Sequence, residues 1–171
     1  MIDHRGATTP CRNRAPRVVL ASGSPRRREL LAVIGLRCLV RPPDIEESPR
    51  SGEGAPAFAL RAAREKTQAV AARLDIEEPG LPILGADTVV ELEGALLGKP
   101  SSRADAEAML GGLAGATHSV HTAVALNVGG RCESLVDTAI VHMLPMSEAT
   151  IRWYVDTGEP MDKAGAYAIQ G

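Results

Sequence analysis

The chain has 171 residues, which is enough for one or two small domains with a hydrophobic core. Its 19 Lys and Arg residues nearly balance its 21 Asp and Glu residues, so it lacks the basic surplus of a protein that binds nucleic acid by bulk electrostatics. Aromatic residues make up only 2% of the chain, which argues against a base-stacking platform for single strands.

The three cysteines are Cys11, Cys38 and Cys132. They are odd in number and far apart, which fits neither a disulfide framework nor a CxxC metal site and indicates the reducing cytoplasm. No run of about 18 apolar residues is present, so we expect no membrane span. Residues 1–16 are polar, Arg-bearing and broken by Pro. We expect them to form a flexible tail before a single domain over 17–171; a transit peptide is the alternative.

The first half of this domain alternates strands and helices. A β-branched run over 17–22 predicts a buried strand. A helix is predicted from Pro25 to about Ile34, with Leu30, Leu31 and Ile34 on one face. The next predicted elements are a strand over 36–40, a long acidic loop over 41–56 and a helix over 57–74.

The second half adds hairpins to this alternation. Residues 83–92 form a predicted strand that Gly85–Thr88 interrupts, and Gly94 turns the chain into a short strand. That short strand covers 95–97, and a helix over 102–113 follows, capped by Ser102 and Asp105. Two strands are then predicted over 119–128 and 131–144, joined by Gly129-Gly130. The last predicted element is a helix over 147–157, which begins at Ser147 and ends before Gly158. This order predicts an α/β fold with a mixed, twisted central sheet and helices on both faces.

A turn rich in small residues and arginines follows the first strand, with the sequence Ser22-Gly23-Ser24-Pro25-Arg26-Arg27-Arg28. Unpaired backbone N–H groups at a helix N-terminus favour a bound anion, and guanidinium groups fit phosphate oxygens. Cations in the first turn oppose the helix dipole, a cost that an anion would relieve. The segment therefore predicts a phosphate site, with a solvated basic helix face as the alternative.

Asp87 lies within an otherwise apolar strand. A buried carboxylate is rare unless it is paired, binds a ligand or is catalytic. Asp87 is therefore a candidate catalytic residue, with a cap at the end of the strand as the alternative.

Leu97-Gly98-Lys99-Pro100 resembles a Walker A motif only superficially. Three residues separate Gly94 from Gly98 where the motif has four, and Pro100 replaces the Ser or Thr that binds Mg²⁺. We reject a P-loop. Lys99 remains a candidate point charge for a phosphate, or an ordinary lysine of a surface turn.

Several other charged or polar segments are less specific. The runs Asp44–Glu47 and Arg64–Lys66 are, taken alone, typical of solvated surfaces. The segment 158–171 carries acidic, basic and amide groups between glycines, and the amide of Gln170 could hydrogen-bond the edge of a base. The histidines at 118 and 121 are three apart on a strand and point to opposite faces, which argues against a joint metal site.

Together and in this order, these segments resemble the Maf family of nucleotide pyrophosphatases. The resemblance runs from Val18 to Gly171 through LASGSPRRRELL, AREK, LGADTVV, LGKP, HSVHTAVAL and YVDTGEPMDKAGAYAIQG. It implies a Maf/inosine-triphosphatase-like fold with a cleft between two lobes, a homodimer, and a divalent cation, Mg²⁺ or Mn²⁺, as cofactor. It also implies hydrolysis of a nucleoside triphosphate to the monophosphate and pyrophosphate.

The resemblance implies roles for individual residues. Asp87 is the expected proton acceptor that activates water, and Glu47 and Asp87 are the expected metal-binding residues. The expected substrate-binding residues are Ser22, Ser24, Arg26, Arg27, Lys66, Thr88, Lys99, Asp162, Lys163 and Gln170.

The family has a branch that prefers dTTP and UTP and another that prefers 7-methyl-GTP. An Arg after Ser-Pro, a Thr after the key Asp and a Gln in the IQG tail mark the first branch, and this sequence matches it at Arg26, Thr88 and Gln170. We therefore expect dTTP and UTP as substrates. The alternatives are modified nucleotides, 7-methyl-GTP, and a non-enzymatic role in inhibiting septum formation.

Members of the family normally continue beyond the IQG motif with a further strand and a segment that bears Gly-Leu-Pro. The sequence stops at Gly171, so we expect the domain to lack that C-terminal strand segment.

Overall fold

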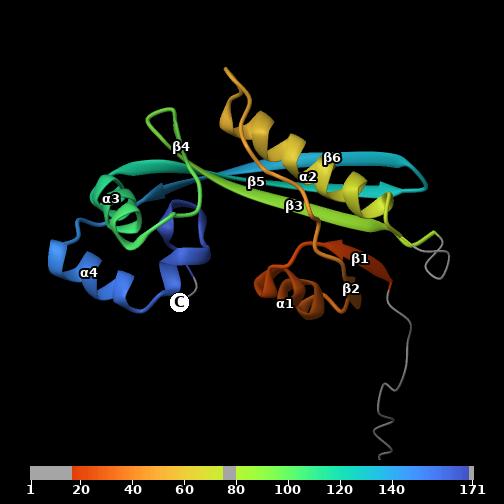
Figure 1. The fold of residues 1–171 in the computed structure, drawn as a ribbon, viewed down its shortest axis with the longest axis horizontal. Helices are drawn as coiled ribbons and strands as arrows, with labels where there is room; N and C mark the ends of the chain where they lie inside the picture. The colour runs from red at the N-terminus through yellow and green to blue at the C-terminus, as the bar shows by residue number, and fades with distance from the viewer. Residues whose placement is uncertain (1–16, 75–79, 170–171) are drawn as a thin grey trace, which may run out of the picture.

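The computed structural model describes residues 17–74 and 80–169. The predicted tail over 1–16 and the candidate residue Gln170 therefore lie outside the described residues. In the described part, six strands form one mixed sheet and four α-helices pack around it (Figure 1), which confirms the predicted α/β class with a mixed sheet. No helix of this part combines the length and the apolar composition needed to cross a bilayer.

The sheet has the strand order β2-β1-β3-β5-β6, and β4 pairs with β3 outside this series. The strands are β1 (Val18–Ala21), β2 (Cys38–Val40), β3 (Ile83–Leu92), β4 (Ala95–Leu97), β5 (Thr117–Val128) and β6 (Arg131–His142). β1 runs parallel to β2 and β3, whereas all the other pairs are antiparallel. The hairpin between β5 and β6 turns through Gly129 and Gly130, both with positive φ, as the glycine pair predicts.

One edge of β3 is open in its middle. β1 pairs with β3 as far as Gly85, β4 pairs with it only from Val90 onward, and β5 occupies the opposite edge along the whole of β3. Among the described residues, no strand therefore pairs with 86–89 on the first edge. The predicted interruption of the strand at Gly85–Thr88 is wrong, because β3 is continuous and only the pairing on one side is interrupted.

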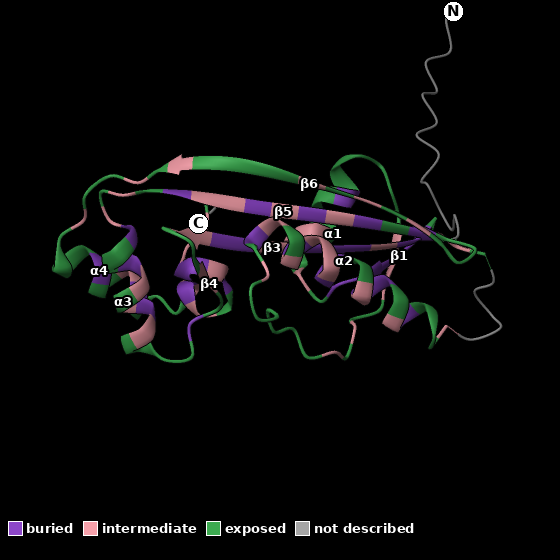
Figure 2. Cartoon of the chain, turned by 90° about the horizontal axis from the view of Figure 1, so that it is seen from above, coloured by how far each residue is buried: buried purple, intermediate pink, exposed green. Residues whose placement is uncertain are grey.

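Helices cover both faces of the sheet (Figures 1 and 2). On one face, α2 (Ala55–Ala71) packs on β3 and β5 through small residues such as Ala59, Ala63 and Ala123. On the other face, α1 (Pro25–Val33) covers β1 at one end of the sheet. The opposite end holds α3 (Arg103–Leu113), α4 (Glu148–Asp156) and two short 3₁₀ helices, η1 (Glu159–Asp162) and η2 (Ala164–Ala166).

The helix ends and apolar faces follow the predicted pattern only in part. Ser102 and Ser147 cap α3 and α4 through their hydroxyl groups, as predicted. Of the three apolar residues predicted to share one face of α1, only Leu31 is buried, whereas Leu30 is 59% and Ile34 67% exposed. The reason is that α1 touches only the β1 end of the sheet, which covers a narrow strip of the helix.

Candidate active site

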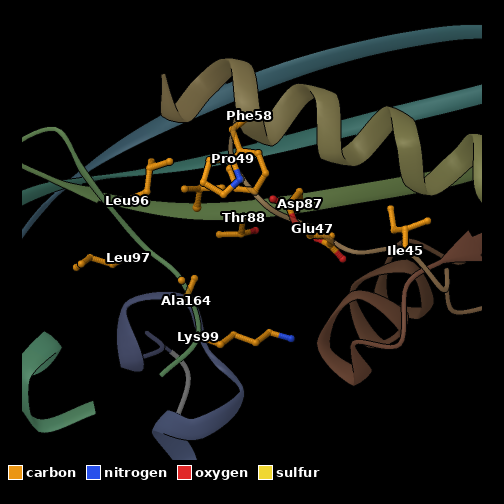
Figure 3. A pocket seen from close by; sticks show the side chains of 12 residues that line it. Ile45, Glu47, Pro49, Phe58, Asp87, Thr88, Leu96, Leu97, Lys99 and Ala164 are labelled. Carbon is orange, nitrogen blue, oxygen red and sulfur yellow. The ribbon is translucent and has the colours of Figure 1, made fainter. Parts of the chain in front are cut away.

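The open edge of β3 lies beside a pocket of about 450 Å³ (Figure 3). Asp87 and Thr88 both line it although consecutive side chains of a strand point to opposite faces, so the pocket reaches both faces of the sheet around the unpaired edge. Its lining residues are Ile45, Glu47, Pro49, Phe58, Asp87, Thr88, Val89, Leu96, Leu97, Gly98, Lys99 and Ala164.

Two carboxylates and a lysine form the polar centre of the site. The Lys66 ammonium donates to Oδ1 of Asp87 at 2.6 Å and lies 2.5 Å from Oε2 of Glu47. Lys66 and Asp87 are buried, at 5% and 8% exposure, whereas Glu47 is an exposed residue whose side chain is 34% accessible. Residues from β3, from α2 and from the loop before α2 therefore meet at one point. Because each charge has an opposite partner, the cluster is compatible with burial.

Arg27, in the first turn of α1, covers the open edge of β3 from the other side. Its Nη1 donates to the Ala86 carbonyl at 2.7 Å and to Ser22 Oγ at 3.1 Å, and its Nη2 donates to Thr88 Oγ1 at 3.4 Å. Burial lowers the pKa of Arg27, while Asp87 and Glu47 act in the opposite direction. A carbonyl that no neighbouring strand pairs is thus satisfied by a guanidinium group.

Ser22 and Ser24 lie in the turn that leads from β1 to α1. Ser22 is buried, and its hydroxyl accepts from the Ser24 backbone N–H at 3.2 Å. Ser24 occupies the N-cap position of α1, although its side chain makes no capping hydrogen bond. The turn itself lies where the sequence predicts it, and Arg27 links it to the Asp87 strand.

Lys99 lines the pocket from the segment that follows β4. In Figure 3 it extends into the pocket from the wall opposite Asp87 and Glu47. The side chain is exposed, and the carbonyl of the preceding Gly98 accepts from the backbone N–H of Gly165 at 3.0 Å. This bond ties the Lys99 segment to η2.

Asp162 and Lys163 interact with each other and with η1. Lys163 donates to Asp162 Oδ1 at 2.7 Å and to the Glu159 carbonyl at 2.6 Å. The hydrogen bond from Lys163 lowers the pKa of Asp162, and the charge of Arg26 adds to the effect. Neither Asp162 nor Lys163 lines the pocket, although the adjacent Ala164 does.

Glu47 and Asp87 offer the hard oxygen donors that Mg²⁺ and Mn²⁺ prefer. In the described residues there is no group of three or more His, Cys, Asp or Glu side chains that could hold a metal by itself. Mg²⁺ commonly binds through one or two carboxylates, with substrate phosphates and water completing its shell. The two carboxylates fit this type of site and do not fit a closed structural metal site.

The histidines take no part in this cluster. His118 bonds to the Tyr167 hydroxyl, whereas His121 bonds to Glu91 and Thr138. The two therefore have separate hydrogen-bond partners.

The apolar part of the lining was not anticipated from the sequence. Phe58, Leu96 and Leu97 form part of the wall, and Phe58 is the only phenylalanine of the chain. The feature of the sequence that could have indicated its place in the lining is its position one turn into a helix, next to the acidic loop.

Comparisons with known proteins agree with the arrangement of these segments. A family model described as "Maf-like protein" matches residues 17–171. A protein of Myxococcus xanthus named "dTTP/UTP pyrophosphatase" is 51% identical over 90% of this chain and 76% of its own length. One of the same name from Symbiobacterium thermophilum is 47% identical over 90% and 77%.

A third such protein, from Anaeromyxobacter dehalogenans, is 48% identical over 92% of this chain and 79% of its own. Among solved structures, protein VC0702 from Vibrio cholerae superposes with a TM-score of 0.45 at 9% identity, over 84% of this chain and 78% of that one, a likeness too weak to assign a fold. The family model covers every residue that the structure describes, and the chain belongs to the Maf family.

Proposed function

We propose that this protein is a nucleoside triphosphate pyrophosphatase that hydrolyses dTTP and UTP to the monophosphate and pyrophosphate. The observation that carries the proposal is the Glu47–Lys66–Asp87 cluster at the open edge of β3, with Lys99 across the same pocket. Relatives that are about half identical carry the name "dTTP/UTP pyrophosphatase". Arg26 and Thr88 match the pattern of that branch of the family, and so does Gln170, outside the described residues.

In the proposed reaction, Asp87 is the general base. The oxygen of a water molecule forms a bond to the α-phosphorus as its proton passes to the Asp87 carboxylate. The bond between that phosphorus and the bridging oxygen of the β-phosphate breaks, and pyrophosphate leaves with the bonding electrons. Lys66 engages Oδ1 of Asp87, so Oδ2 is the oxygen we assign as proton acceptor. Holding a carboxylate in one orientation contributes to the rate by positioning.

The remaining site residues would bind the triphosphate. Lys99 carries an exposed ammonium at the pocket, and Arg26 and Arg27 stand in the first turn of α1. Ser22 and Ser24 would supply donors from the turn, and Asp162 and Lys163, which do not line the pocket themselves, would support its wall through the adjacent Ala164. A divalent cation held by Glu47 and Asp87 would neutralise part of the phosphate charge. These cationic groups offset the charge that develops on the leaving pyrophosphate.

Several broader expectations belong to the same proposal. Residues 17–171 form one catalytic domain, and the pocket is the cleft between two lobes of a Maf/inosine-triphosphatase-like fold. We expect the protein to be cytoplasmic, and the free thiols of Cys38 and Cys132 are consistent with that reducing compartment. The homodimer stays a prediction that a measurement of molar mass in solution would test.

The test is pyrophosphate release from dTTP, UTP, CTP and 7-methyl-GTP with Mg²⁺ or Mn²⁺. We expect dTTP and UTP to be preferred, and Asp87→Asn to lower kcat by about 10² to 10⁴-fold. Asp137→Asn, at an exposed position of β6, is the matched control. Near wild-type turnover of Asp87→Asn would overturn the general-base assignment. Preference for 7-methyl-GTP would overturn the substrate assignment, and no release from any nucleotide would favour a binding role in septum formation.

A further inference from the structure

The segment 41–54 between β2 and α2, here called the strap, carries Glu47 to the active site. In Figure 1 the strap rises from β2 alongside α2 to the beginning of that helix. Three basic residues hold it at successive points. Arg73, just after the end of α2, pairs with Asp44 at 3.1 Å. Within α2, Lys66 pairs with Glu47, and Arg61 pairs with Glu53 at the end of the strap. The strap therefore runs antiparallel to α2, fixed at its start, middle and end.

Arg61 makes the most extensive of these attachments. Its Nε and Nη2 donate to the two carboxylate oxygens of Glu53 at 2.7 and 2.6 Å. Nη2 also donates to the Ser48 carbonyl at 2.9 Å, and Nη1 donates to Glu65 at 2.9 Å. The guanidinium carbon lies 5.3 Å from the centroid of the Phe58 ring. One half-buried side chain thus binds two points of the strap and one neighbour on its own helix.

The Arg61–Glu53 pair is held in its charged form. The hydrogen bonds from Arg61, with one from the Arg50 backbone N–H, lower the pKa of Glu53 to about 2. The bidentate geometry needs the planar fork of a guanidinium group, which an ammonium group cannot reproduce.

The attachment matters for the site because Ser48 is the residue directly after Glu47. Glu47 reaches Lys66 across the pocket lining, and Pro49 lies in the same lining. The Ser48 carbonyl is exposed on one side and has Arg61 as its donor. Without that donor, the ion pairs left among the described residues to hold the strap between Asp44 and Glu53 would be Lys66–Glu47 itself and the more exposed Arg50–Glu65 pair.

We propose that Arg61 is a positioning residue of the proposed reaction: by holding the Ser48 carbonyl and Glu53, it keeps the strap in the position where Glu47 reaches the Asp87 site. Arg61 touches neither the pocket nor Asp87 and acts through Glu47. This inference rests on the proposed function for its kinetic part and on the geometry of the strap for the rest.

The first test is a double-mutant cycle on dTTP hydrolysis by the whole chain. We expect Arg61→Met to lower kcat by about 10²-fold, since small displacements of a catalytic group have effects of this size. Arg61→Lys should not restore the rate. In a Glu47→Gln background the same Arg61→Met change should lower kcat little further, because coupled residues are not additive. If the fold-loss of kcat in the double variant equals the product of the fold-losses in the two single variants, the inference is overturned.

The matched control is Arg73→Met, which removes the exposed ion pair between Asp44 of the strap and Arg73, just after α2. We expect it to leave kcat within about twofold of wild type, as exposed ion pairs contribute little. A loss equal to that of Arg61→Met would overturn the claim that Arg61 has a specific role. If thermal unfolding shows that Arg61→Met is not folded, Glu53→Gln takes its place, because it weakens the same Arg61–Glu53 interaction. The same changes in kcat are then expected.

The second test does not need activity. Trypsin cleavage after Arg50, in the exposed part of the strap, should be severalfold faster in Arg61→Met than in wild type and unchanged in Arg73→Met. Equal cleavage of Arg61→Met and wild type would overturn the inference even if kcat falls. If the wild type releases no pyrophosphate, the proposed function fails by itself, and the cleavage rates alone decide whether Arg61 holds the strap.

Discussion

Gly85 of β3 lies so close to α2 that a Cβ at this position would come 2.5 Å from the Ala63 carbonyl oxygen and 2.7 Å from the Thr67 methyl group. Both neighbours belong to the packed core between helix and sheet, so neither can yield cheaply. The same contact brings Lys66 down onto Asp87, since the Lys66 Cβ would be 3.4 Å away. The absence of a side chain at Gly85 therefore sets the distance between α2 and β3.

Gly85→Ala tests this relationship. We expect it to lower the free energy of unfolding by about 1–3 kcal/mol, the usual cost of overpacking a core, and to lower kcat by moving Lys66 away from Asp87. The measurement is urea unfolding together with dTTP hydrolysis. Gly111→Ala on α3, where a Cβ meets nothing within 4 Å, should instead be neutral or stabilising. Equal stability of the two variants would contradict the prediction.

Lys66 lies between Glu47 and Asp87 and pairs with both carboxylates, and Lys66→Met removes this cation. Leaving a buried charge without its partner costs about 3–5 kcal/mol, so we expect a much lower midpoint of thermal unfolding. Because Mn²⁺ can replace the lost charge, adding it should raise the midpoint more in Lys66→Met than in wild type. An equal rise in the two proteins would argue against a cation site at this pair.

Lys99→Ala should separate substrate binding from folding. Lys99 is exposed and lines the pocket, so its removal should leave thermal stability unchanged while kcat/KM for dTTP falls by about 10²-fold, as for loss of one charge-stabilising donor. Arg152→Ala, which removes an exposed ion pair with Glu148 on α4, is the control and should alter neither quantity. Unchanged kcat/KM in Lys99→Ala would place the triphosphate elsewhere.

His118 should make stability depend on pH. Burial lowers its pKa below the ordinary value of 6.5, and its Nδ1 is buried without a partner in the described part of the chain. The unfolded chain therefore binds a proton that the folded chain rejects. Stability is fully present above pH 6.5 and falls as the pH drops from there toward the lowered pKa.

The measurement is urea unfolding of wild type and His118→Gln between about pH 7.5 and 5.5, the range in which histidine titrates. Gln can still bond to the Tyr167 hydroxyl but does not titrate, so the slope of stability against pH should become shallower. His142→Gln, at an exposed histidine bonded to Thr117, should retain the wild-type slope. The same slope in all three proteins would exclude His118 as its source.

Local patterns predicted much of the fold. The apolar run over 83–92 and Gly94 gave the bounds of β3 and β4, and Ser102 marked the start of α3, because strand propensity, turns and caps act over a few residues. Gly85 was misinterpreted as a break in the strand. Its role is to admit α2, and a requirement set by a partner 22 residues away leaves no local signature.

For the candidate site, too, local patterns in the sequence identified residues but not their long-range contacts. The candidate residues of the turn after β1 and of β3 could be named individually, but their contacts depend on non-local pairing. Arg27 was predicted to face a phosphate or solvent, and the structure shows its guanidinium on the Ala86 carbonyl. That contact exists only because β1 lies beside β3, and no pattern within the Arg-rich turn encodes it. The hydrogen bonds from Arg61 to the strap were likewise not predicted, because they too depend on contacts outside the local pattern.

The open stretch of β3 also bears on how the protein folds. Arg27 and the Ala86 carbonyl that it satisfies are 59 positions apart in the chain. They meet only after β1 has paired in parallel with β3. The strands β3, β4, β5 and β6, by contrast, pair with one another in antiparallel fashion. Pairings that close long loops form late. We therefore expect β1 and its arginine-bearing turn to pair with β3 after the antiparallel strands have formed during refolding of the whole chain, and the proposed hydrolysis to require this last pairing.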